Sequence, residues 1–199
     1  LGGVYNAFDG LSRESEAFEQ SLLPIDEQTA NDIVGTSSTA LRSSRKNLFK
    51  VNEETGLLAD PDGLIRMIRN ITGFRAKDTG DPQQGFHGII LDPEAEQPEF
   101  SRYKGLVVTG GNDHMGEAGK VAELMQILGI RNSRGHIFQV IAVPKSIDND
   151  AMTQMLGYHS GASFVNALFK AYAQKVQAEG KTLIAEAMGR KAGWLALKA

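Results

Sequence analysis

A cation, a hydroxyl and two carboxylates lie close together in the segment 142–150, which reads Ala-Val-Pro-Lys-Ser-Ile-Asp-Asn-Asp. The four side chains are those of Lys145, Ser146, Asp148 and Asp150. A carboxylate near a lysine can accept a proton from a substrate hydroxyl while the ammonium neutralises phosphate charge. The alternatives are a solvated polar loop without chemistry, or a loop that is simply ordered by an ion pair between the lysine and a carboxylate.

We expect buried strands to position these side chains. The apolar run Phe138–Val143 predicts a strand, which Pro144 ends because proline has no N–H to donate to a neighbouring strand. Similar runs at Leu106–Val108 and Leu183–Ala187 predict two further strands. Ligands of open α/β sheets bind beyond the carboxyl ends of the strands, so all three strand ends are candidate positions for a site.

Helical periodicity fills the segments between these strands. Strands that alternate with helices indicate a parallel sheet with right-handed crossovers, so the predicted class is α/β. Four helices are expected. The first, at 25–34, has Asp26 or Thr29 as N-cap and Gly35 after it, and the second, at 61–72, ends before Gly73. The third and fourth are expected at 116–128 and 162–176, and the residues expected to face inward are Leu64, Ile68 and Ile71 in the second helix, Val121, Leu124, Met125 and Leu128 in the third, and Val165, Leu168, Phe169, Tyr172 and Val176 in the fourth.

Two further segments have residue types that suit phosphate groups. The loop Gly35–Lys46 holds Arg42, Arg45 and Lys46 among hydroxyls, all able to bond phosphate oxygens, although it is equally a plain polar loop. Gly110 and Gly111 precede an expected helix, where backbone N–H groups suit anions. The Gly-x-Gly-x-x-Gly pattern of dinucleotide binders is absent from this turn, which argues against a nicotinamide cofactor.

Composition excludes several classes of protein. The chain has 199 residues, 41% of them hydrophobic, which suits one globular domain over residues 1–199, with the Gly-, Pro- and acid-rich 74–102 as an insertion. A net charge of −3 argues against a broad nucleic-acid surface, and the lack of Cys excludes disulfides and thiol nucleophiles. No apolar run suits a membrane span and no signal peptide is visible, so we expect a cytoplasmic protein.

Both ends of the chain predict a fragment of a longer protein. The sequence begins with Leu1 rather than Met, and it stops at Ala199 inside a helix expected from near Lys191. We therefore expect this segment alone to be inactive.

Four segments, in order along the chain, resemble the phosphofructokinases. Gly35–Lys46 is similar to the family's Gly-Gly-Thr-x-Leu-x-Ser-Ser-Arg loop, and 110–114 to its Gly-Gly-Asp-Gly-Ser turn. Pro144–Asp150 resembles its Pro-x-Thr-Ile-Asp-Asn-Asp loop, and 186–190 its Glu-Val-Met-Gly-Arg segment. The resemblance implies a partial phosphofructokinase fold, which is a Rossmann-like, three-layer α/β architecture with a parallel sheet. It also implies an enzyme that transfers phosphate to fructose 6-phosphate.

The resemblance also implies roles for individual residues. Asp148 would accept the proton of the sugar's C1 hydroxyl, Lys145 would stabilise the transferring phosphoryl group, and Asp150 would support the base or a Mg²⁺ ion. The donor-phosphate residues would be Arg45, Lys46, Gly111 and Asp113. The sugar-phosphate residues would be Ser146, Lys181, Met188, Gly189 and Arg190, with Lys181 reaching a neighbouring subunit of a homo-oligomer.

Two positions resemble the pyrophosphate-dependent branch of the family. Asp113 and Lys145 stand where ATP-dependent members carry glycines, and a carboxylate at 113 would crowd and repel a nucleotide's α-phosphate region. The rival is an ATP-dependent 6-phosphofructokinase.

Departures from the family pattern leave other classes open. Asn112 stands where the family has its metal-linked Asp, which weakens magnesium binding because Mg²⁺ prefers carboxylate oxygens. His114 and the segment 157–160 also differ from the family pattern. A non-catalytic member that binds sugar phosphate is therefore a second hypothesis, and a plain α/β interaction module is a third.

Overall fold

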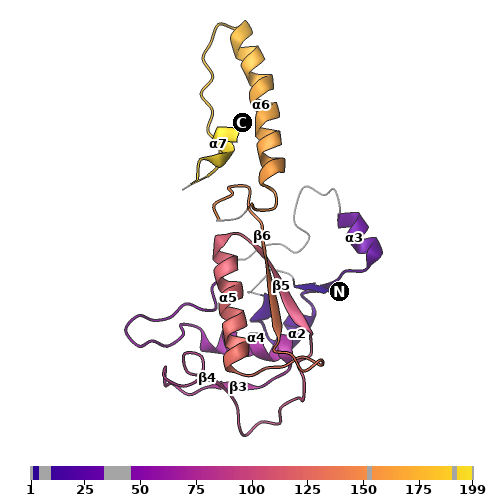
Figure 1. The fold of residues 1–199 in the computed structure, drawn as a ribbon, viewed down its shortest axis with the longest axis vertical. Helices are drawn as coiled ribbons and strands as arrows, with labels where there is room; N and C mark the ends of the chain where they lie inside the picture. The colour runs from indigo at the N-terminus through magenta and orange to yellow at the C-terminus, as the bar shows by residue number, and fades with distance from the viewer. Residues whose placement is uncertain (1, 5–9, 34–45, 152–153, 190–191, 199) are drawn as a thin grey trace. The chain divides into compact units, whose positions relative to one another are not determined.

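The structure is a computed structural model that describes residues 2–4, 10–33, 46–151, 154–189 and 192–198 (Figure 1). The chain divides into two compact units, each described below by itself. The first comprises Leu1–Leu106 and Lys120–Gln139, and the second Val107–Gly119 and Val140–Ala199. The expected single domain over residues 1–199 stays a prediction.

The first unit combines short helices with two antiparallel strand pairs. In one pair β1 (Gly2–Val4) lies against β2 (Leu22–Pro24), and in the other β3 (Ala76–Asp78) lies against β4 (Ile89–Leu91). Its helices are α2 (Ser15–Glu19), α3 (Glu27–Ile33) and α4 (Pro61–Thr72). The helix expected at 25–34 is thus confirmed as α3, where the backbone N–H of Thr29 donates to Asp26 Oδ1 over 2.7 Å. Gly35 lies outside the described residues.

Helix α4 has the bounds that its sequence predicts. It begins after Asp60, whose Oδ1 accepts a hydrogen bond of 2.9 Å from the backbone N–H of Gly63, and Pro61 follows the cap, where no N–H is needed. A Cβ at position 63 would clash with the Asp60 carboxylate, so glycine lets the cap close over the first turn. The helix ends at Gly73, which has a φ of 80° and the left-handed conformation typical of a C-cap.

The core of the first unit forms around the apolar face of α4. The predicted inward residues Leu64, Ile68 and Ile71 are all buried. They share this core with apolar side chains from elsewhere in the unit: Phe18, Leu48, Phe49, Phe86, Ile89, Val121, Leu124 and Met125. Burial of a large apolar side chain contributes roughly 1.5–3 kcal/mol, so this cluster is the main source of stability in the first unit.

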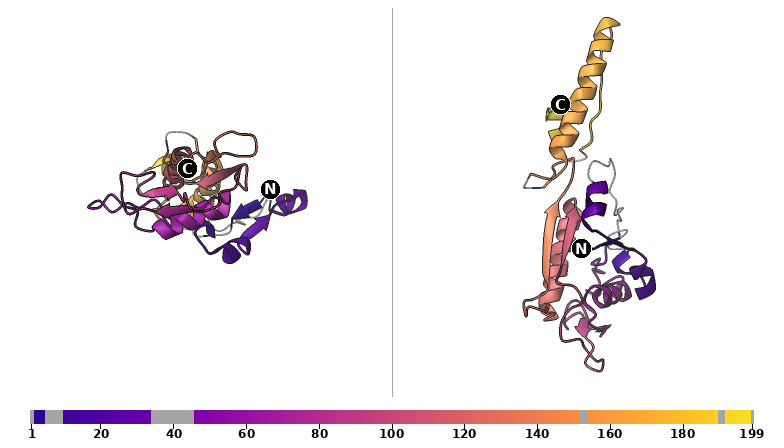
Figure 2. Two further views of the ribbon diagram at one scale, coloured as in Figure 1. Left: turned by 90° about the horizontal axis from the view of Figure 1, so that it is seen from below. Right: turned by 90° about the vertical axis from the view of Figure 1, so that its right-hand side faces the viewer.

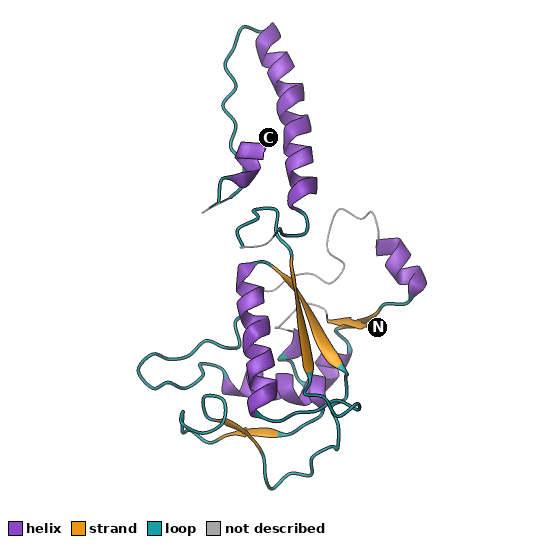
Figure 3. Cartoon of the chain, in the orientation of Figure 1, coloured by secondary structure: helices purple, strands orange, loops and turns teal. Residues whose placement is uncertain are grey.

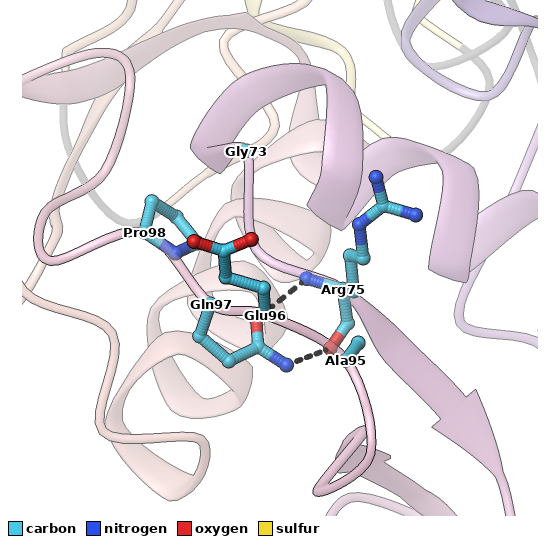
Figure 4. Close-up of a pocket in the computed structure, with 6 residues that line it drawn as sticks. All are labelled: Gly73, Arg75, Ala95, Glu96, Gln97 and Pro98. Carbon is cyan, nitrogen blue, oxygen red and sulfur yellow. Dashed lines mark hydrogen bonds between the residues drawn. The ribbon is translucent and has the colours of Figure 1, made fainter.

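Residues 74–102 form the β3–β4 hairpin and a returning segment that is tied to its base. The Gln97 side chain accepts a hydrogen bond from the Arg75 N–H and donates one to the Arg75 carbonyl, each 2.9 Å long (Figure 4). These two bonds imitate a strand pairing. The open hollow lined by Gly73, Arg75, Ala95, Glu96, Gln97 and Pro98 is thus a by-product of this pairing.

Strands β5 (Gly105–Gly110) and β6 (Gln139–Pro144) form a two-stranded sheet, joined by a connection that contains α5 (Asn112–Ile127). At one end, a Cβ on Gly105 would lie 2.7 Å from the carbonyl oxygen of Gln139. At the other end, the N–H of Lys145 donates to the carbonyl of Gly110 over 2.7 Å. The strands therefore run in the same direction, and both lead into loops at the same edge, as the sequence predicts.

The third predicted strand, Leu183–Ala187, is wrong. After α6 (Tyr158–Ala178), residues 181–189 are a loop that runs back beside the helix to α7 (Trp194–Lys198) (Figures 1 and 3). Ile184 is 93% exposed. A strand is held by backbone hydrogen bonds to a neighbour, and no strand among the described residues pairs with this segment.

The predicted buried stripe of α6 is also wrong in this structure. Leu168 and Tyr172 are 40% and 55% exposed, and Ala162 is the buried residue of the helix. Among the described residues of the second unit no third strand joins β5 and β6, so their two-stranded sheet has no wide face against which such a stripe could pack. The contacts of α6 are instead made with the short α7, which lies beside it in two views (Figures 1 and 2).

No helix in the described parts of the chain is both long and apolar enough to cross a membrane.

The Asp60 cap makes stability depend on pH. Although partial burial alone raises the pKa of the Asp60 carboxyl, the Gly63 N–H and the Lys46 and Arg66 cations together hold that pKa below its usual 3.8. A carboxyl whose pKa is lower in the folded state than in the unfolded state stabilises the fold at pH values above its unfolded-state pKa. This contribution is lost as the pH falls through the folded-state pKa. We expect Asp60→Ala to cost about 1 kcal/mol near neutral pH.

Asp60→Asn is the matched control, because asparagine caps helices nearly as well but carries no charge. The stability difference between wild type and Asp60→Asn, measured by urea unfolding, should shrink between about pH 7 and about pH 3. An equal difference at both pH values would show that the charge of Asp60 contributes nothing.

Candidate active site

The loop after β6 is closed at its base by backbone hydrogen bonds. The N–H of Ser146 donates to the carbonyl of Leu156 over 3.1 Å, and the N–H of Leu156 donates to the carbonyl of Pro144 over 3.0 Å. Lys145 and Leu156 thereby pair as in a short parallel bridge. Because the Lys145 N–H also bonds Gly110, the base of the loop is joined directly to the end of β5.

Polar side chains bond the inside of this loop. The Oγ of Ser146 accepts from the N–H of Asp148 over 3.1 Å, so this serine shapes the turn that presents the carboxylate. Asn149 has a φ of 52°, a conformation that asparagine tolerates better than most residues. Its Oδ1 accepts from the N–H of Met155 over 3.0 Å, and the Met155 side chain is buried.

Asp148 has an unsatisfied carboxylate oxygen. The residue is half-buried, and its Oδ1 is shielded from solvent without a hydrogen-bond partner among the described residues. Such atoms are rare in native proteins and call for an explanation, one of which is a catalytic role. The oxygen is free to accept a proton from a hydroxyl placed beside it.

Lys145 does not pair with Asp148. Its side chain is exposed, and within the described ranges it forms no ion pair with any carboxylate. The alternative in which these two residues serve only to order the loop by pairing with each other therefore finds no support. An exposed ammonium directly after the end of β6, with no ion-pair partner within the described ranges, is available to an anionic ligand.

The first turn of α5 lies at the same edge as this loop. The side-chain amide of Asn112 donates to the backbone carbonyl of Asp150 over 3.4 Å, a long bond that joins the two segments. Asp113 follows with an exposed carboxylate in the first turn. Gly110 is required because a Cβ there would lie 2.6 Å from the ring of His114. The fold thus brings Gly111, Asn112 and Asp113 to the lysine- and aspartate-bearing loop.

A magnesium site stays a prediction. In the part of the chain that the structure describes, no three His, Asp or Glu side chains gather closely enough to hold a metal ion. Mg²⁺ can also bind through one or two carboxylates together with substrate phosphates, for which Asp150 is exposed at the sheet edge. The amide of Asn112 is turned to the Asp150 carbonyl, so this residue serves here as a donor that joins two segments.

The predicted sugar-phosphate residues after α6 do not lie at a strand end. Lys181 pairs with Glu179 over 2.7 Å on the surface, and Met188 is 66% exposed. Gly189 has a φ of 135°, and a Cβ there would clash with the carbonyl of Ala192. Arg190 and Arg45 lie outside the described residues, so their predicted roles stay predictions.

Lys46 belongs to the first unit and has contacts that the sequence analysis missed. Its Nζ lies 3.1 Å from Asp60 Oδ2 and 2.9 Å from Ser12 Oγ. An Asp directly before Pro61 at a helix start is a capping signal, which could have identified Asp60 as a fixed carboxylate. Nothing in the sequence relates Ser12 to the other two residues, because 34 positions separate it from Lys46.

Comparisons with known proteins show which family the chain belongs to. The family model described as Phosphofructokinase matches residues 1–199. The chain is 26% identical over 177 residues to a pyrophosphate–fructose 6-phosphate 1-phosphotransferase of Dictyoglomus thermophilum, covering 88% of this chain and 37% of that protein. It is 40% identical over 100 residues to a protein of the same name from Xanthomonas campestris, covering 47% of this chain and 22% of that protein.

An ATP-dependent relative is also similar. The chain is 35% identical over 96 residues to an ATP-dependent 6-phosphofructokinase of Spirochaeta thermophila, covering 47% of this chain and 23% of that protein. The chain thus spans less than two fifths of the length of these relatives. The family match and the parallel β5–β6 pair confirm the predicted α/β class with a partial Rossmann-like architecture.

The loop conformation at Asn149 yields a test of the site's scaffold. Asn149→Gly keeps a residue that adopts positive φ and loses the bond to Met155, so it should cost about 1 kcal/mol of stability. Asn149→Ala loses the bond and also strains the backbone, so it should cost more. Hydrogen exchange at the Met155 amide, together with thermal unfolding, checks both variants. Equal stability of the two would show that position 149 has no need of positive φ.

Proposed function

We propose, since the chain belongs to the phosphofructokinase family, that the protein containing it transfers a phosphoryl group from pyrophosphate to the C1 hydroxyl of fructose 6-phosphate. Two relatives carry the name of this activity, although the chain covers 37% of one and 22% of the other. The observation that carries the proposal is the edge where β5 and β6 end. Within the described residues, Lys145 there has no ion-pair partner and Oδ1 of Asp148 has no hydrogen-bond partner.

In the proposed reaction Asp148 accepts the proton of the sugar hydroxyl. The sugar oxygen then bonds the terminal phosphorus of pyrophosphate, and the bond from that phosphorus to the bridging oxygen breaks. Fructose 1,6-bisphosphate and inorganic phosphate leave, and Asp148 passes its proton to the departing phosphate or to water, so atoms and charge balance over the turnover. Lys145 neutralises negative charge on the phosphoryl group during transfer. This interaction is strongest in the transition state, because the charge of the phosphoryl group is redistributed there.

The donor assignment rests on Asp113 and Lys145. An exposed carboxylate in the first turn of α5 would repel a nucleotide's α-phosphate, whereas a compact diphosphate needs only a local cation. The similarity to an ATP-dependent enzyme keeps ATP as the rival donor.

The remaining proposed roles follow the sequence predictions. Arg45 and Gly111 would contact the donor phosphates, and a homo-oligomer would bring Lys181 to a neighbouring subunit's substrate. The sugar phosphate would be held by Ser146, Met188, Gly189 and Arg190. A Mg²⁺ ion, when bound near Asp150 and the donor, would further neutralise phosphate charge, and every step above uses residues of the chain alone.

The donor is tested by turnover of the full-length protein with fructose 6-phosphate and either pyrophosphate or ATP. We expect product with pyrophosphate and little with ATP. Turnover with ATP alone would refute the donor assignment. Tight binding of fructose 6-phosphate without turnover by either donor would favour the non-catalytic alternative, for which the replacement of an expected Asp by Asn112 is the motivating feature.

The base is tested by Asp148→Asn, which keeps the side-chain size and removes the proton acceptor. Turnover should fall by about 10²–10⁴-fold while the affinity for fructose 6-phosphate changes little. Lys145→Ala should lower kcat more than donor binding, because its partner charge grows during transfer. Glu123→Gln, which neutralises an exposed carboxylate of α5, is the matched control. Near-wild-type turnover of Asp148→Asn would show that another group is the base.

A further inference from the structure

Ile147, which lies between Ser146 and Asp148 in the loop after β6, packs against the first turn of α6. A Cβ at Gly161 would lie 3.3 Å from both the Cβ and the Cγ2 of Ile147, and a Cβ at Gly157 would lie 3.7 Å from that Cγ2. Ile147 itself is half-buried. Its branched side chain therefore rests on the backbone of the helix, in space that two glycines one turn apart leave open.

Gly161 is an unfavourable residue for its position in the helix. Glycine destabilises the interior of a helix relative to alanine, because it loses more backbone freedom on folding. Gly157 is explained by its φ of 94°, a conformation that favours glycine. Gly161 has no positive φ, and its N–H donates to the carbonyl of Gly157 over 2.9 Å as in a regular helix. Glycine at position 161 therefore accommodates the close approach of Ile147.

A second side chain reaches the same turn from α7. The Cδ2 of Leu195 would lie 3.7 Å from a Cβ at Gly161, and Leu195 is 1% exposed. The hydroxyl of Tyr158, the first residue of α6, donates to the backbone carbonyl of Trp194 over 3.3 Å. The first turn of α6 thus contacts both the loop after β6 and α7. We call this cluster the Ile147 seat: Ile147, Gly157, Gly161 and Leu195.

The Ile147 seat acts on the part of the loop that presents Asp148. The Cβ of Ile147 is bonded directly to the backbone, so a change of side-chain rotamer cannot move it away from Gly161. If this Cβ is displaced, the backbone of Ile147 is displaced with it. The next residue is Asp148, which a rigid, planar peptide unit joins to Ile147. The seat therefore influences where the carboxylate of Asp148 lies.

We infer that Gly161 is a positioning residue for Asp148. Because Gly161 has no side chain, Ile147 can approach the helix closely, and this contact fixes the backbone that carries the carboxylate. Gly161 acts through Ile147 rather than on the substrate. The inference rests on the proposed function, in which Asp148 is the base.

Gly161→Ala adds one methyl group where 3.3 Å separates its position from two carbon atoms of Ile147. Carbon atoms pack best at about 3.5–4.0 Å, so the loop must shift away from the helix. We expect kcat of the full-length protein to fall on the order of tenfold while KM for fructose 6-phosphate is nearly kept, because a misplaced base impairs transfer more than binding. Steady-state kinetics with the donor that the wild type uses measures both quantities.

Gly119→Ala is the matched control, since it makes the same change at a glycine of α5 whose Cβ would meet nothing within 4 Å. It should keep kcat and lose no stability. Ile147→Leu moves the branch of the side chain away from Cβ at constant volume, so in the Gly161→Ala background it should restore part of kcat. Unchanged kcat in Gly161→Ala, or additive effects of the two changes, would overturn the inference.

A purely structural role of the Ile147 seat predicts a different result. Gly161→Ala would then lower the melting temperature while the folded protein kept its kcat, and this outcome would refute a positioning role. If Gly161→Ala does not fold, Ile147→Ala decides, because it empties the seat without adding volume. Its kcat should fall with KM nearly kept, and wild-type kcat in this variant would count against the inference.

Hydrogen exchange at the Asp148 amide separates this inference from the proposed function. That amide donates to Ser146 Oγ over 3.1 Å, so a displaced loop should speed its exchange in Gly161→Ala but not in Gly119→Ala. Turnover with ATP alone refutes only the donor assignment, and the kinetics are then measured with ATP. If the wild type turns over neither donor, the proposed function fails. Faster Asp148 exchange in Gly161→Ala then still supports the seat, and exchange equal to that of the wild type overturns it.

Discussion

The hydrogen bond from the Lys145 N–H to the Gly110 carbonyl, 2.7 Å long, is the contact on which the candidate site depends. It extends the parallel pairing of β5 and β6 by one residue beyond the strands and joins the two loops that hold the chemistry. A parallel pair places both carboxyl ends at one edge, so residues more than thirty positions apart in the chain become neighbours there. Without this pairing, the lysine and aspartates after β6 would have no fixed relation to the glycine turn before α5.

The closed loop after β6 leaves one carboxylate oxygen of Asp148 in an energetically unfavourable position. Its buried Oδ1 lacks a partner among the described residues, and a buried polar group left unsatisfied costs about 1–3 kcal/mol. The side-chain hydrogen bonds of Ser146 and Asn149, with the backbone bonds that Leu156 makes to Ser146 and Pro144, offset this cost and hold the loop in place. A preformed acceptor of this kind needs little reorganisation when a hydroxyl binds, and preorganisation is what makes polar groups effective in catalysis.

The sequence predicts the local features of this fold better than the long-range ones. The bounds of α4 follow from Asp60, Pro61 and Gly73, because caps act within one turn of a helix. The β5–α5–β6 unit follows from apolar runs and helical periodicity, but the expected burial of its strands is wrong, since Val107 and Ile141 are 63% and 57% exposed. The stripe of α6 is just as periodic, yet Tyr172 is 55% exposed, because burial requires an opposing surface that periodicity does not reveal. A strand at Leu183–Ala187 likewise requires a neighbour, which the described residues do not provide.

The three candidate phosphate-binding lysines also differ in contacts that the sequence does not reveal. By residue type, Lys46, Lys145 and Lys181 are equivalent, and the resemblance gives all three a phosphate to bind. Their surroundings differ: Lys46 is paired with a helix-capping carboxylate and Lys181 with Glu179, whereas Lys145 has no ion-pair partner within the described ranges. A cation that already has a carboxylate gains less from a phosphate than one that has none, because the existing pair must first be broken. The surroundings therefore distinguish three cations that the composition of the sequence treats alike, and they leave Lys145 as the one of the three without an ion-pair partner within the described ranges.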